Sequence, residues 1–371
     1  MVTKGEPDMK ILVVTGASGG HIFPALSFLD ACKKRPECGE ALLVLPRLSI
    51  KRHLDLSGYQ TAYIGVSAVG RDLSFKNAAA LMRLFLAFFE SLIVLTRFRP
   101  KLVAAFGSIV CVPLVVLARL AGARIMLHEQ NVVPGKATMF LARFAHRICV
   151  SFDKTAGYFK DFRDKIAVTG NPLRAGLIRI EKKKALEFFG FAATAPVLLV
   201  MGGSQGSHRI NFSFLEAIAA MPVSQRLQVI HISGSGDLET VQSRYRALKI
   251  NARVFAFLES MEYAYSACDF VVSRAGATTL AELVFFGLPS LIIPYPFANA
   301  HQRENARVLE QVLGAVIIEE QELSALGMRQ VIADFLKSAH PLRSTAPPEG
   351  SGRASSAGDA LADEAWRLLQ R

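Results

Sequence analysis

The chain has 371 residues, of which 51% are hydrophobic and 20% are charged. These values exclude a disordered, collagen-like or coiled-coil chain, and the length predicts two domains. Lys and Arg total 43 against 31 Asp and Glu, and the formal net charge of +12 favours an anionic partner, which could be nucleic acid, a phosphorylated ligand or an acidic membrane surface.

The cysteines and the apolar segments bear on the cellular compartment. Five cysteines are scattered without a CxxC pair: Cys32, Cys38, Cys111, Cys149 and Cys268. This odd set argues against a disulfide framework and against a structural zinc site. The apolar run 11–14 is too short for a secretory signal, and the stretch 78–96 contains Arg83 and Glu90. We therefore expect a reducing cytosolic environment and no membrane-spanning helix.

Short runs rich in β-branched residues recur along the chain and end in glycine or polar residues, which is typical of buried parallel strands. The first half contains ILVVTG, ALLVLP, TAYIGV, LVAAFGS, RIMLHEQN, RICVSF and KIAVTGNP, and the second half contains VLLVMGG, QVIHISG, RVFAFL, FVVSRAG, SLIIPY and AVIIEE. Helical patterns such as residues 211–220 fall between them. This alternation predicts an α/β fold with a doubly wound sheet in each half.

Both halves open with a strand, a glycine-rich loop and a helix, since one strand leads into GASGGH and another into GGSQG. With a boundary at the segment GNPLR, we expect a first domain over residues 1–173 and a second over residues 174–343. The Pro/Gly/Ser-rich composition predicts a linker over residues 344–358. Residues 359–371 are expected to form a final helix that returns to the first domain.

The two glycine loops are candidate phosphate-binding sites. Glycine lets backbone N–H groups approach a ligand, and the N-terminus of the following helix adds partial positive charge. Neither loop has the spacing of GxxxxGK[ST] or GxGxxG, which disfavours ATPase and dinucleotide-binding functions, and tight turns without a ligand are the alternative. His21 follows the first loop at a helix start. There an imidazole would be held neutral and could act as a general base, or it could serve only the fold.

Polar residues follow several predicted strands, as in residues 128–131, GNPLR and residues 273–276. Because open α/β sheets bind ligands at the carboxyl ends of their strands, we expect a site in a cleft between two such edges. Arg174 could contact a phosphate there or simply face solvent. Glu282 could accept both hydroxyls of a ribose. Alternatively, the spacing Thr279-x-x-Glu282 is that of a helix capping box, in which the carboxylate only binds a backbone N–H.

Six motifs follow one another within residues 9–336: GxxGGHIFPAL, LHEQNxxPG, GNPxR, GGSQG, SRAGAxTxAE and HQxxNA. Their order resembles that of the MurG family of peptidoglycan N-acetylglucosaminyltransferases. The resemblance implies the GT-B fold, in which two Rossmann-like domains face a central cleft. It also implies an inverting transfer of N-acetylglucosamine from UDP-N-acetylglucosamine to the C4 hydroxyl of lipid I, the lipid-linked N-acetylmuramyl-pentapeptide, which yields lipid II. No DxD pair occurs, so helix N-termini and arginine would neutralise a diphosphate, and no metal or other cofactor is expected.

The same resemblance implies roles for individual residues. His21 would take the proton from the acceptor hydroxyl, and Glu282 would bind the ribose of a donor lying mainly on the second domain. The other implied substrate-binding residues are Ser204 and Arg174 near the diphosphate, Leu258 near uracil, Ala277, Thr278, Thr279, Leu280 and Ala281 around the nucleoside, and Ser18, Gly19, Gly20, Asn131 and Gln302 facing the sugar.

The chain departs from the family pattern on the side expected to hold the acceptor pyrophosphate. Ala17 stands where glycine is usual, and GSIVC at residues 107–111 replaces the common GGYVS. Ser108 would restrict the backbone if that position needs a positive φ. Two other functions are possible: a UDP-N-acetylglucosamine epimerase of similar fold, and a basic nucleic-acid-binding module. The second depends on the net charge and on the lysine run 182–184, which is more typical of a solvated helix face.

A strongly apolar helix is predicted between residues 78 and 96. One face carries Leu81, Leu84, Phe85, Phe88, Phe89, Leu92 and Leu95, and the rest of the helix is apolar as well, with Met82, Leu86, Ile93 and Val94. A fully buried helix would have the same pattern. The basic flank Arg97, Arg99 and Lys101 favours a peripheral contact with anionic lipids at the cytoplasmic face of the plasma membrane.

Overall fold

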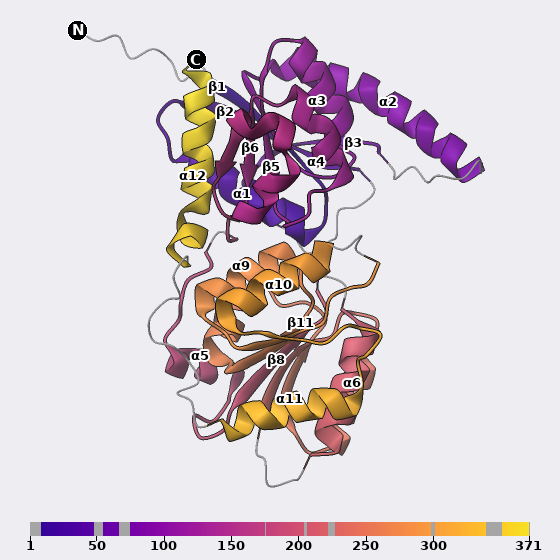
Figure 1. Cartoon of the computed structure of the whole chain (residues 1–371), viewed down its shortest axis with the longest axis vertical. Coiled ribbons are helices and arrows are strands. Elements are labelled where there is room, and N and C mark those ends of the chain that lie inside the picture. Colours follow the sequence, from indigo (N-terminus) through magenta and orange to yellow (C-terminus); the bar gives the residue numbers. More distant parts are fainter. Residues whose placement is uncertain are drawn as a thin grey trace. The chain divides into compact units, whose positions relative to one another are not determined.

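The computed structural model describes residues 9–47, 55–66, 75–174, 176–203, 206–221, 227–297, 301–338 and 351–370. The chain divides into two compact units (Figure 1). One consists of Met1–Ala175 together with Arg353–Arg371, and the other of Gly176–Gly352. The first unit thus ends at Ala175, whereas we expected the boundary after residue 173.

In the described part of the first unit, parallel strands form a sheet of order β3-β2-β1-β4-β5-β6-β7. The strands are β1 (Met9–Thr15), β2 (Cys38–Pro46), β3 (Gln60–Ile64), β4 (Leu102–Phe106), β5 (Arg124–Glu129), β6 (Arg147–Val150) and β7 (Ile166–Val168). Val13 of the interior strand β1 lies opposite Leu43 on one side and Ala104 on the other. Both faces of this sheet are covered, which explains the uninterrupted apolar runs in the sequence.

Helices of the first unit pack on the two faces of this sheet. They are α1 (Gly19–Lys33), α2 (Phe75–Phe98), α3 (Cys111–Leu120), α4 (Lys136–Leu141) and α12 (Ser351–Leu369). Successive side chains of a strand point to opposite faces. Accordingly, Leu12 and Val14 join a core with α2, α3 and α4, whereas Ile11 and Val13 join a core with α1 and α12. The C-terminal helix is thus part of the core of the first unit.

The predicted linker over residues 344–358 is wrong in its second half, because α12 begins at Ser351; residues 344–350 lie outside the described residues. A Cβ atom on Gly358 would lie only 2.9 Å from Oγ of Ser27 on α1. Gly358, which we predicted to belong to a linker, therefore permits a close approach between α12 and α1. Leu361 and Ala365 follow at helical spacing and are fully buried.

The second unit has a parallel sheet of order β10-β9-β8-β11-β12-β13 in its described residues. The strands are β8 (Val197–Met201), β9 (Gln228–Ile232), β10 (Asn251–Phe255), β11 (Phe270–Ser273), β12 (Ser290–Ile292) and β13 (Val316–Ile317). The helices are α5 (Lys182–Phe189), α6 (His208–Ala219), α7 (Leu238–Ala247), α8 (Met261–Ala267), α9 (Ala277–Phe286), α10 (His301–Leu313) and α11 (Ala325–Lys337). The predicted α/β fold with a parallel sheet in each half is confirmed.

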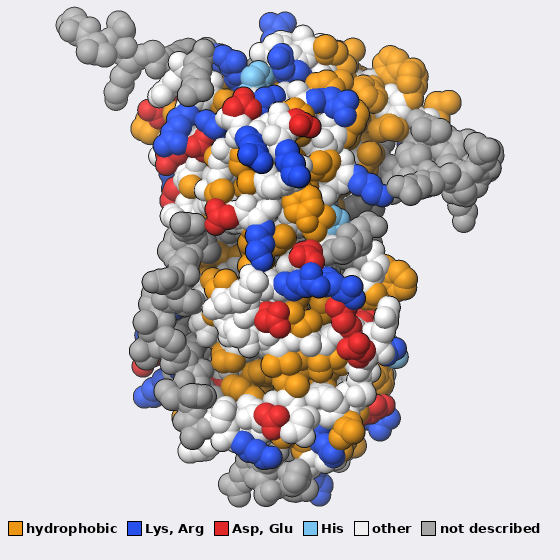
Figure 2. Space-filling model, viewed as in Figure 1, with side chains coloured by type: hydrophobic (Ala, Val, Ile, Leu, Met, Phe, Trp, Pro, Cys, Tyr) orange, Lys and Arg blue, Asp and Glu red, His pale blue; other side chains and the backbone are white. Residues whose placement is uncertain are grey.

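Helix α2 turns a broad apolar surface toward solvent. Ala87, Leu95 and Phe98 are buried against the sheet, and Leu84 packs on the same core. Large side chains that are between 48% and 59% exposed are Met82, Phe85, Leu86, Phe89, Leu92 and Ile93. Figure 2 shows hydrophobic side chains gathered over this helix.

These exposures exclude the alternative that α2 is fully buried. The seven residues predicted to share one face are divided, since Leu84 and Leu95 pack on the core whereas Phe85, Phe89 and Leu92 are exposed. Leu81 lies outside the residues whose side chains the structure describes. Among the helices of the described ranges, none combines the length and the hydropathy that crossing a membrane requires.

Candidate functional site

The first glycine loop connects β1 to α1 and orients His21. Ser18 is the N-cap of α1, and its carbonyl oxygen accepts hydrogen bonds of 3.0 Å from the backbone N–H groups of His21 and Ile22. The hydroxyl of Ser18 lies 2.8 Å from Nδ1 of His21. This contact fixes the partly exposed imidazole in the first turn of the helix, beside Gly19 and Gly20.

The loop that follows β4 lies against His21. Gly107 has φ of +77°, and a Cβ atom there would lie 3.0 Å from Nε2 of His21, so this position requires glycine. Ser108 also has φ of +77°, which means that the serine occupies a backbone conformation that favours glycine. Ala17 is not among the described residues with positive φ, so its departure from glycine carries no such strain. Cys111 donates its thiol to the carbonyl oxygen of Gly107 over 2.7 Å.

Residues of the LHEQN motif after β5 are engaged in hydrogen bonds within the fold. Glu129 accepts the backbone N–H groups of Asn131 and Gly135 over 3.0 Å each, and it accepts the side-chain amide of Asn131 over 3.1 Å. His128 is buried, lies 3.2 Å through Nε2 from the carbonyl oxygen of Gly170, and lies 3.1 Å through Nδ1 from the amide nitrogen of Gln130. Burial lowers the pKa of His128 to about 4, so this imidazole is neutral at neutral pH.

Two buried amides beside these residues were not predicted from the sequence. Oε1 of Gln130 and both polar side-chain atoms of Asn171 have no hydrogen-bond partner in the described part of the chain. Oε1 of Gln130 lies 3.6 Å from the position that a Cβ of residue 107 would take, close to the ring of His21. The sequence could have indicated both amides only through their positions in the motifs LHEQN and GNPLR, which follow predicted strands. Arg174, at the end of the first unit, lies over the ring of Phe23 at 4.4 Å.

The second glycine loop connects β8 to α6. A Cβ on Gly202 would lie 2.2 Å from the backbone nitrogen of Ser207, and one on Gly206 would lie 2.0 Å from the carbonyl oxygen of Ser233. Only glycine fits at either position. Ser207 caps α6 and accepts a hydrogen bond of 2.8 Å from Arg274, for which the sequence had indicated no role. Ser204 lies outside the described residues.

Glu282 lies on α9 and is only 2% exposed. The N-cap of this helix is Gly276, so Thr279 stands inside the helix and Glu282 a full turn further on. The capping-box interpretation is therefore wrong, because it requires Thr279 to be the N-cap. A carboxylate oxygen of Glu282 instead accepts the hydroxyl of Tyr265 over 2.7 Å.

The remaining predicted residues of the second unit also follow strand ends. Leu258 is buried after β10, and Ala277, Thr278, Thr279, Leu280 and Ala281 form the first turns of α9 after β11. Gln302, at the start of α10, accepts the backbone N–H groups of Ala275 over 3.2 Å and Tyr295 over 2.9 Å. Within each unit, the predicted site residues that the structure describes thus collect at the carboxyl edge of the sheet. No group of three or more potential metal ligands occurs in the described ranges.

Two family models match the chain. Residues 11–150 match the glycosyltransferase family 28 N-terminal domain, and residues 197–358 match the glycosyltransferase family 28 C-terminal domain. Together they cover most of the first sheet, without β7, and all of the second.

Relatives of known sequence match nearly the whole chain. The "UDP-N-acetylglucosamine--N-acetylmuramyl-(pentapeptide) pyrophosphoryl-undecaprenol N-acetylglucosamine transferase" of Geobacter sulfurreducens is 35% identical over 359 residues, which is 96% of this chain and 98% of the relative. The protein of the same name from Desulforamulus reducens is 33% identical over 346 residues, covering 91% and 93% of the two chains.

Solved structures share the fold at lower identity. MurG of Acinetobacter baumannii superposes with a TM-score of 0.70 at 22% identity, over 98% of this chain and 99% of that one. A putative UDP-N-acetylglucosamine 2-epimerase of Listeria monocytogenes gives a TM-score of 0.68 at 12% identity, over 98% and 96%. These likenesses establish the fold but do not separate transferase from epimerase, whereas the sequence matches do. The chain belongs to glycosyltransferase family 28, has the GT-B fold, and is a hexosyltransferase of the MurG family.

Proposed function

We propose that this enzyme transfers N-acetylglucosamine from UDP-N-acetylglucosamine to the C4 hydroxyl of a lipid-linked N-acetylmuramyl-pentapeptide, with inversion at the anomeric carbon. The observation that carries the proposal is 33–35% identity over more than nine-tenths of the chain to relatives whose names state the donor and the lipid-linked acceptor. The C4 hydroxyl and the inversion are what the resemblance to the family implies. The oxygen of the acceptor hydroxyl bonds to the anomeric carbon, the bond from that carbon to the UDP oxygen breaks, and the hydroxyl proton leaves to a base.

The donor is assigned to the second unit. The loop 202–206, in which Gly202 and Gly206 have no room for a side chain, would let the diphosphate approach the N-terminus of α6, together with Ser204. Glu282 would accept the ribose hydroxyls beside residues 277–281, Leu258 would lie near uracil, and Gln302 near the sugar. The negative charge that develops on departing UDP would meet helix N–H groups already oriented before the reaction.

His21 is assigned as the base that takes the acceptor proton. Its ring is oriented by Ser18 in a partly exposed position beside the glycine loop. The two neighbouring candidates are less suitable, because Glu129 is occupied by three hydrogen bonds and His128 is buried with a pKa lowered to about 4 by that burial. Asn131, Gly19 and Gly20 would contact the sugars, and Arg174 the diphosphate.

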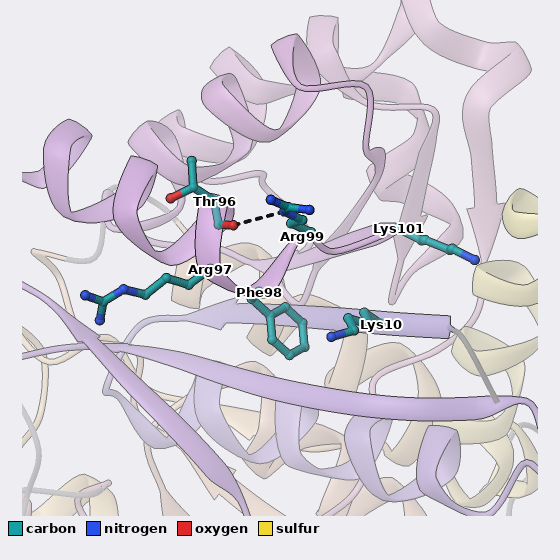
Figure 3. Close-up of a pocket in the computed structure, with 6 residues that line it drawn as sticks. All are labelled: Lys10, Thr96, Arg97, Phe98, Arg99 and Lys101. Carbon is teal, nitrogen blue, oxygen red and sulfur yellow. Dashed lines mark hydrogen bonds between the residues drawn. The ribbon is translucent and has the colours of Figure 1, made fainter. Parts of the chain in front are cut away.

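We assign a peripheral membrane contact to the first unit. The contact would be made by α2 and by a basic pocket at the C-terminal end of that helix. The pocket, of about 430 Å³, is lined by Lys10, Thr96, Arg97, Phe98, Arg99 and Lys101 (Figure 3). Its lining has four cations and no acidic residue, although Lys10 also pairs with Glu40 at 3.0 Å. Each cation near an anionic membrane surface contributes ~1 kcal/mol of attraction. Together with the apolar side chains exposed on α2, this suits an enzyme whose acceptor is held in a bilayer.

The proposed reaction is tested by incubating the full chain with radiolabelled UDP-N-acetylglucosamine and a short-chain lipid I analogue. Label in a disaccharide-lipid product is the expected result. Conversion of the donor to its 2-epimer without transfer would instead favour the epimerase, whose fold is shared. Salt-sensitive RNA binding without UDP binding would favour a nucleic-acid-binding module. Absence of transfer across several detergents would overturn the proposal.

A further inference from the structure

A chain of buried hydrogen bonds lies behind the second glycine loop. His231, on β9, is fully buried. Its Nδ1 lies 2.8 Å from the hydroxyl of Tyr245 on α7, and its Nε2 lies 3.0 Å from Oδ1 of Asn211 on α6. Nδ2 of Asn211 in turn donates to the carbonyl oxygen of Ser233 over 2.9 Å and to Oδ2 of Asp237 over 2.8 Å.

The direction of every bond in this chain follows from the acceptors at its end. The carbonyl of Ser233 and the carboxylate of Asp237 only accept, so the side-chain nitrogen of Asn211 faces them and its oxygen faces His231. The imidazole must then donate from Nε2 and accept at Nδ1, where Tyr245 donates its O–H. Burial lowers the pKa of His231 to about 3, and the ring is therefore neutral and in this one tautomer at neutral pH.

One end of this chain of hydrogen bonds is the carbonyl oxygen of Ser233, against which Gly206 packs. A Cβ on Gly206 would lie 2.0 Å from the carbonyl oxygen of Ser233, which is the oxygen that Asn211 binds. Asn211 belongs to the second turn of α6, whose N-cap is Ser207. One side chain therefore holds the start of α6 and the loop after β9 in a fixed relation, and Gly206 packs against the same carbonyl oxygen of Ser233.

We propose that His231 is a positioning residue for the donor diphosphate. It acts through Asn211: by donating from Nε2, it fixes the amide that joins α6 to Ser233 and Asp237, and so sets where the N–H groups at the N-terminus of α6 point. Electrostatic binding by a helix N-terminus requires those groups to be oriented before the ligand arrives. The inference rests on the proposed donor site in the second unit.

The test compares three variants by calorimetric titration with UDP and by steady-state kinetics. His231→Leu removes the donor to Asn211, and its Kd for UDP is expected to rise at least tenfold, together with the KM for the sugar nucleotide but not the KM for the lipid acceptor. His231→Gln retains an N–H that reaches Asn211 and should stay within about threefold of the wild type. Ile332→Ala is the control for a loss of stability alone. It opens a cavity in the core of the second unit, on α11, and leaves the hydrogen bonds of His231 and Asn211 in place.

Asp237→Ala covers the case in which His231→Leu does not fold, because Asp237 is partly exposed and accepts the amide of Asn211. The other carboxylate oxygen of Asp237 lies 3.0 Å from Nδ1 of His208, so His208→Ala is measured beside it to separate the loss of that contact. Removing a carboxylate would by charge alone favour an anionic ligand, whereas the proposal expects weaker UDP binding. Unchanged or tighter UDP binding by Asp237→Ala, or equal losses in Ile332→Ala and His231→Leu, would overturn it. If the wild-type enzyme itself binds no UDP, the proposed donor site fails instead, and the two failures are thereby distinguished.

Discussion

Ser108 and Gly16 are in close contact across the first glycine loop: the Cβ of Ser108 lies 2.8 Å from the position that a Cβ on residue 16 would take. Gly16 also borders His21, since Nδ1 of His21 lies 3.0 Å from the same position. Ser108 additionally has φ of +77°. Ser108 is therefore coupled through this contact to Gly16, the first glycine of the loop that leads to His21.

Gly16→Ala should accordingly destabilise the enzyme and lower turnover by displacing His21. Ser108→Gly relieves the positive φ, worth ~1 kcal/mol, and should be neutral or slightly stabilising. Adding Ser108→Gly to Gly16→Ala should recover part of the loss, with a coupling energy of about 1 kcal/mol in a urea-unfolding double-mutant cycle. If the changes in the free energy of unfolding are strictly additive, the contact between the two residues does not contribute to stability.

His21→Ala should lower turnover by ~100-fold or more while leaving UDP affinity nearly intact, because a positioned base contributes in that range to the chemical step. Single-turnover kinetics with saturating donor measures the step directly. Ser18→Ala is the matched variant, since it removes the 2.8 Å contact that orients the ring but keeps the imidazole. Near-normal turnover of His21→Ala would exclude this residue as the base.

Glu282→Ala should weaken UDP binding by about 1 to 3 kcal/mol if the carboxylate accepts the ribose hydroxyls. Tyr265→Phe provides the control, because it removes the 2.7 Å hydrogen bond within the fold and keeps the carboxylate. Calorimetry with UDP and thermal unfolding are measured for both. A loss of thermal stability in both variants with unchanged UDP affinity would mean that Glu282 serves only the fold.

Most of the fold was predictable from the sequence because parallel strands buried on both faces leave continuous apolar runs. Ile11 to Val14 form such a run, and the structure divides its side chains between two cores. The helical conformation around Gly358 in α12 was not predictable, because glycine lowers helix propensity and the close packing against Ser27 is visible only in the structure. Tertiary contact overrode local composition there.

The candidate site was predictable where chemistry follows a strand end, as for His21 and Glu282. The supporting residues were not. Asn211 and His231 are separated by 20 residues and meet only because β9 lies beside β8 and α6 packs behind them. The sequence also did not predict which side of α2 faces solvent. Nearly every position of that helix is apolar, and only the packing on the sheet decides which side is covered.

Stability should fall as the pH is lowered, because two imidazoles are buried in neutral form. Burial lowers the pKa of His128 to about 4 and that of His231 to about 3, against ~6.5 in an unfolded chain. The unfolded state therefore binds more protons below pH ~6.5, and each histidine costs ~1.4 kcal/mol of stability per pH unit until its folded pKa is reached. Urea unfolding at pH 7, 6 and 5 should show a shallower decline for His231→Gln. Parallel curves for the variant and the wild type would contradict the assignment.

Replacing Arg97, Arg99 and Lys101 together with Glu should release the folded enzyme from anionic vesicles. The three side chains border the basic pocket beside the exposed apolar surface of α2, and reversing them replaces attraction to lipid phosphates by repulsion. Flotation with vesicles containing phosphatidylglycerol measures the effect, and turnover of a soluble acceptor analogue checks that the fold is kept.

The control for this charge reversal changes Lys183, Lys184 and Arg246 to Glu, three exposed cations of the second unit. It alters the net charge equally and should leave flotation unchanged if the contact lies on the first unit. A further variant, Phe85→Ser with Phe89→Ser, removes two exposed rings that pack on each other at 5.1 Å between centroids and should weaken binding to neutral vesicles as well. Equal release by both charge reversals would mean that net charge alone drives attachment. Unchanged flotation of the pocket variant would place the membrane contact elsewhere.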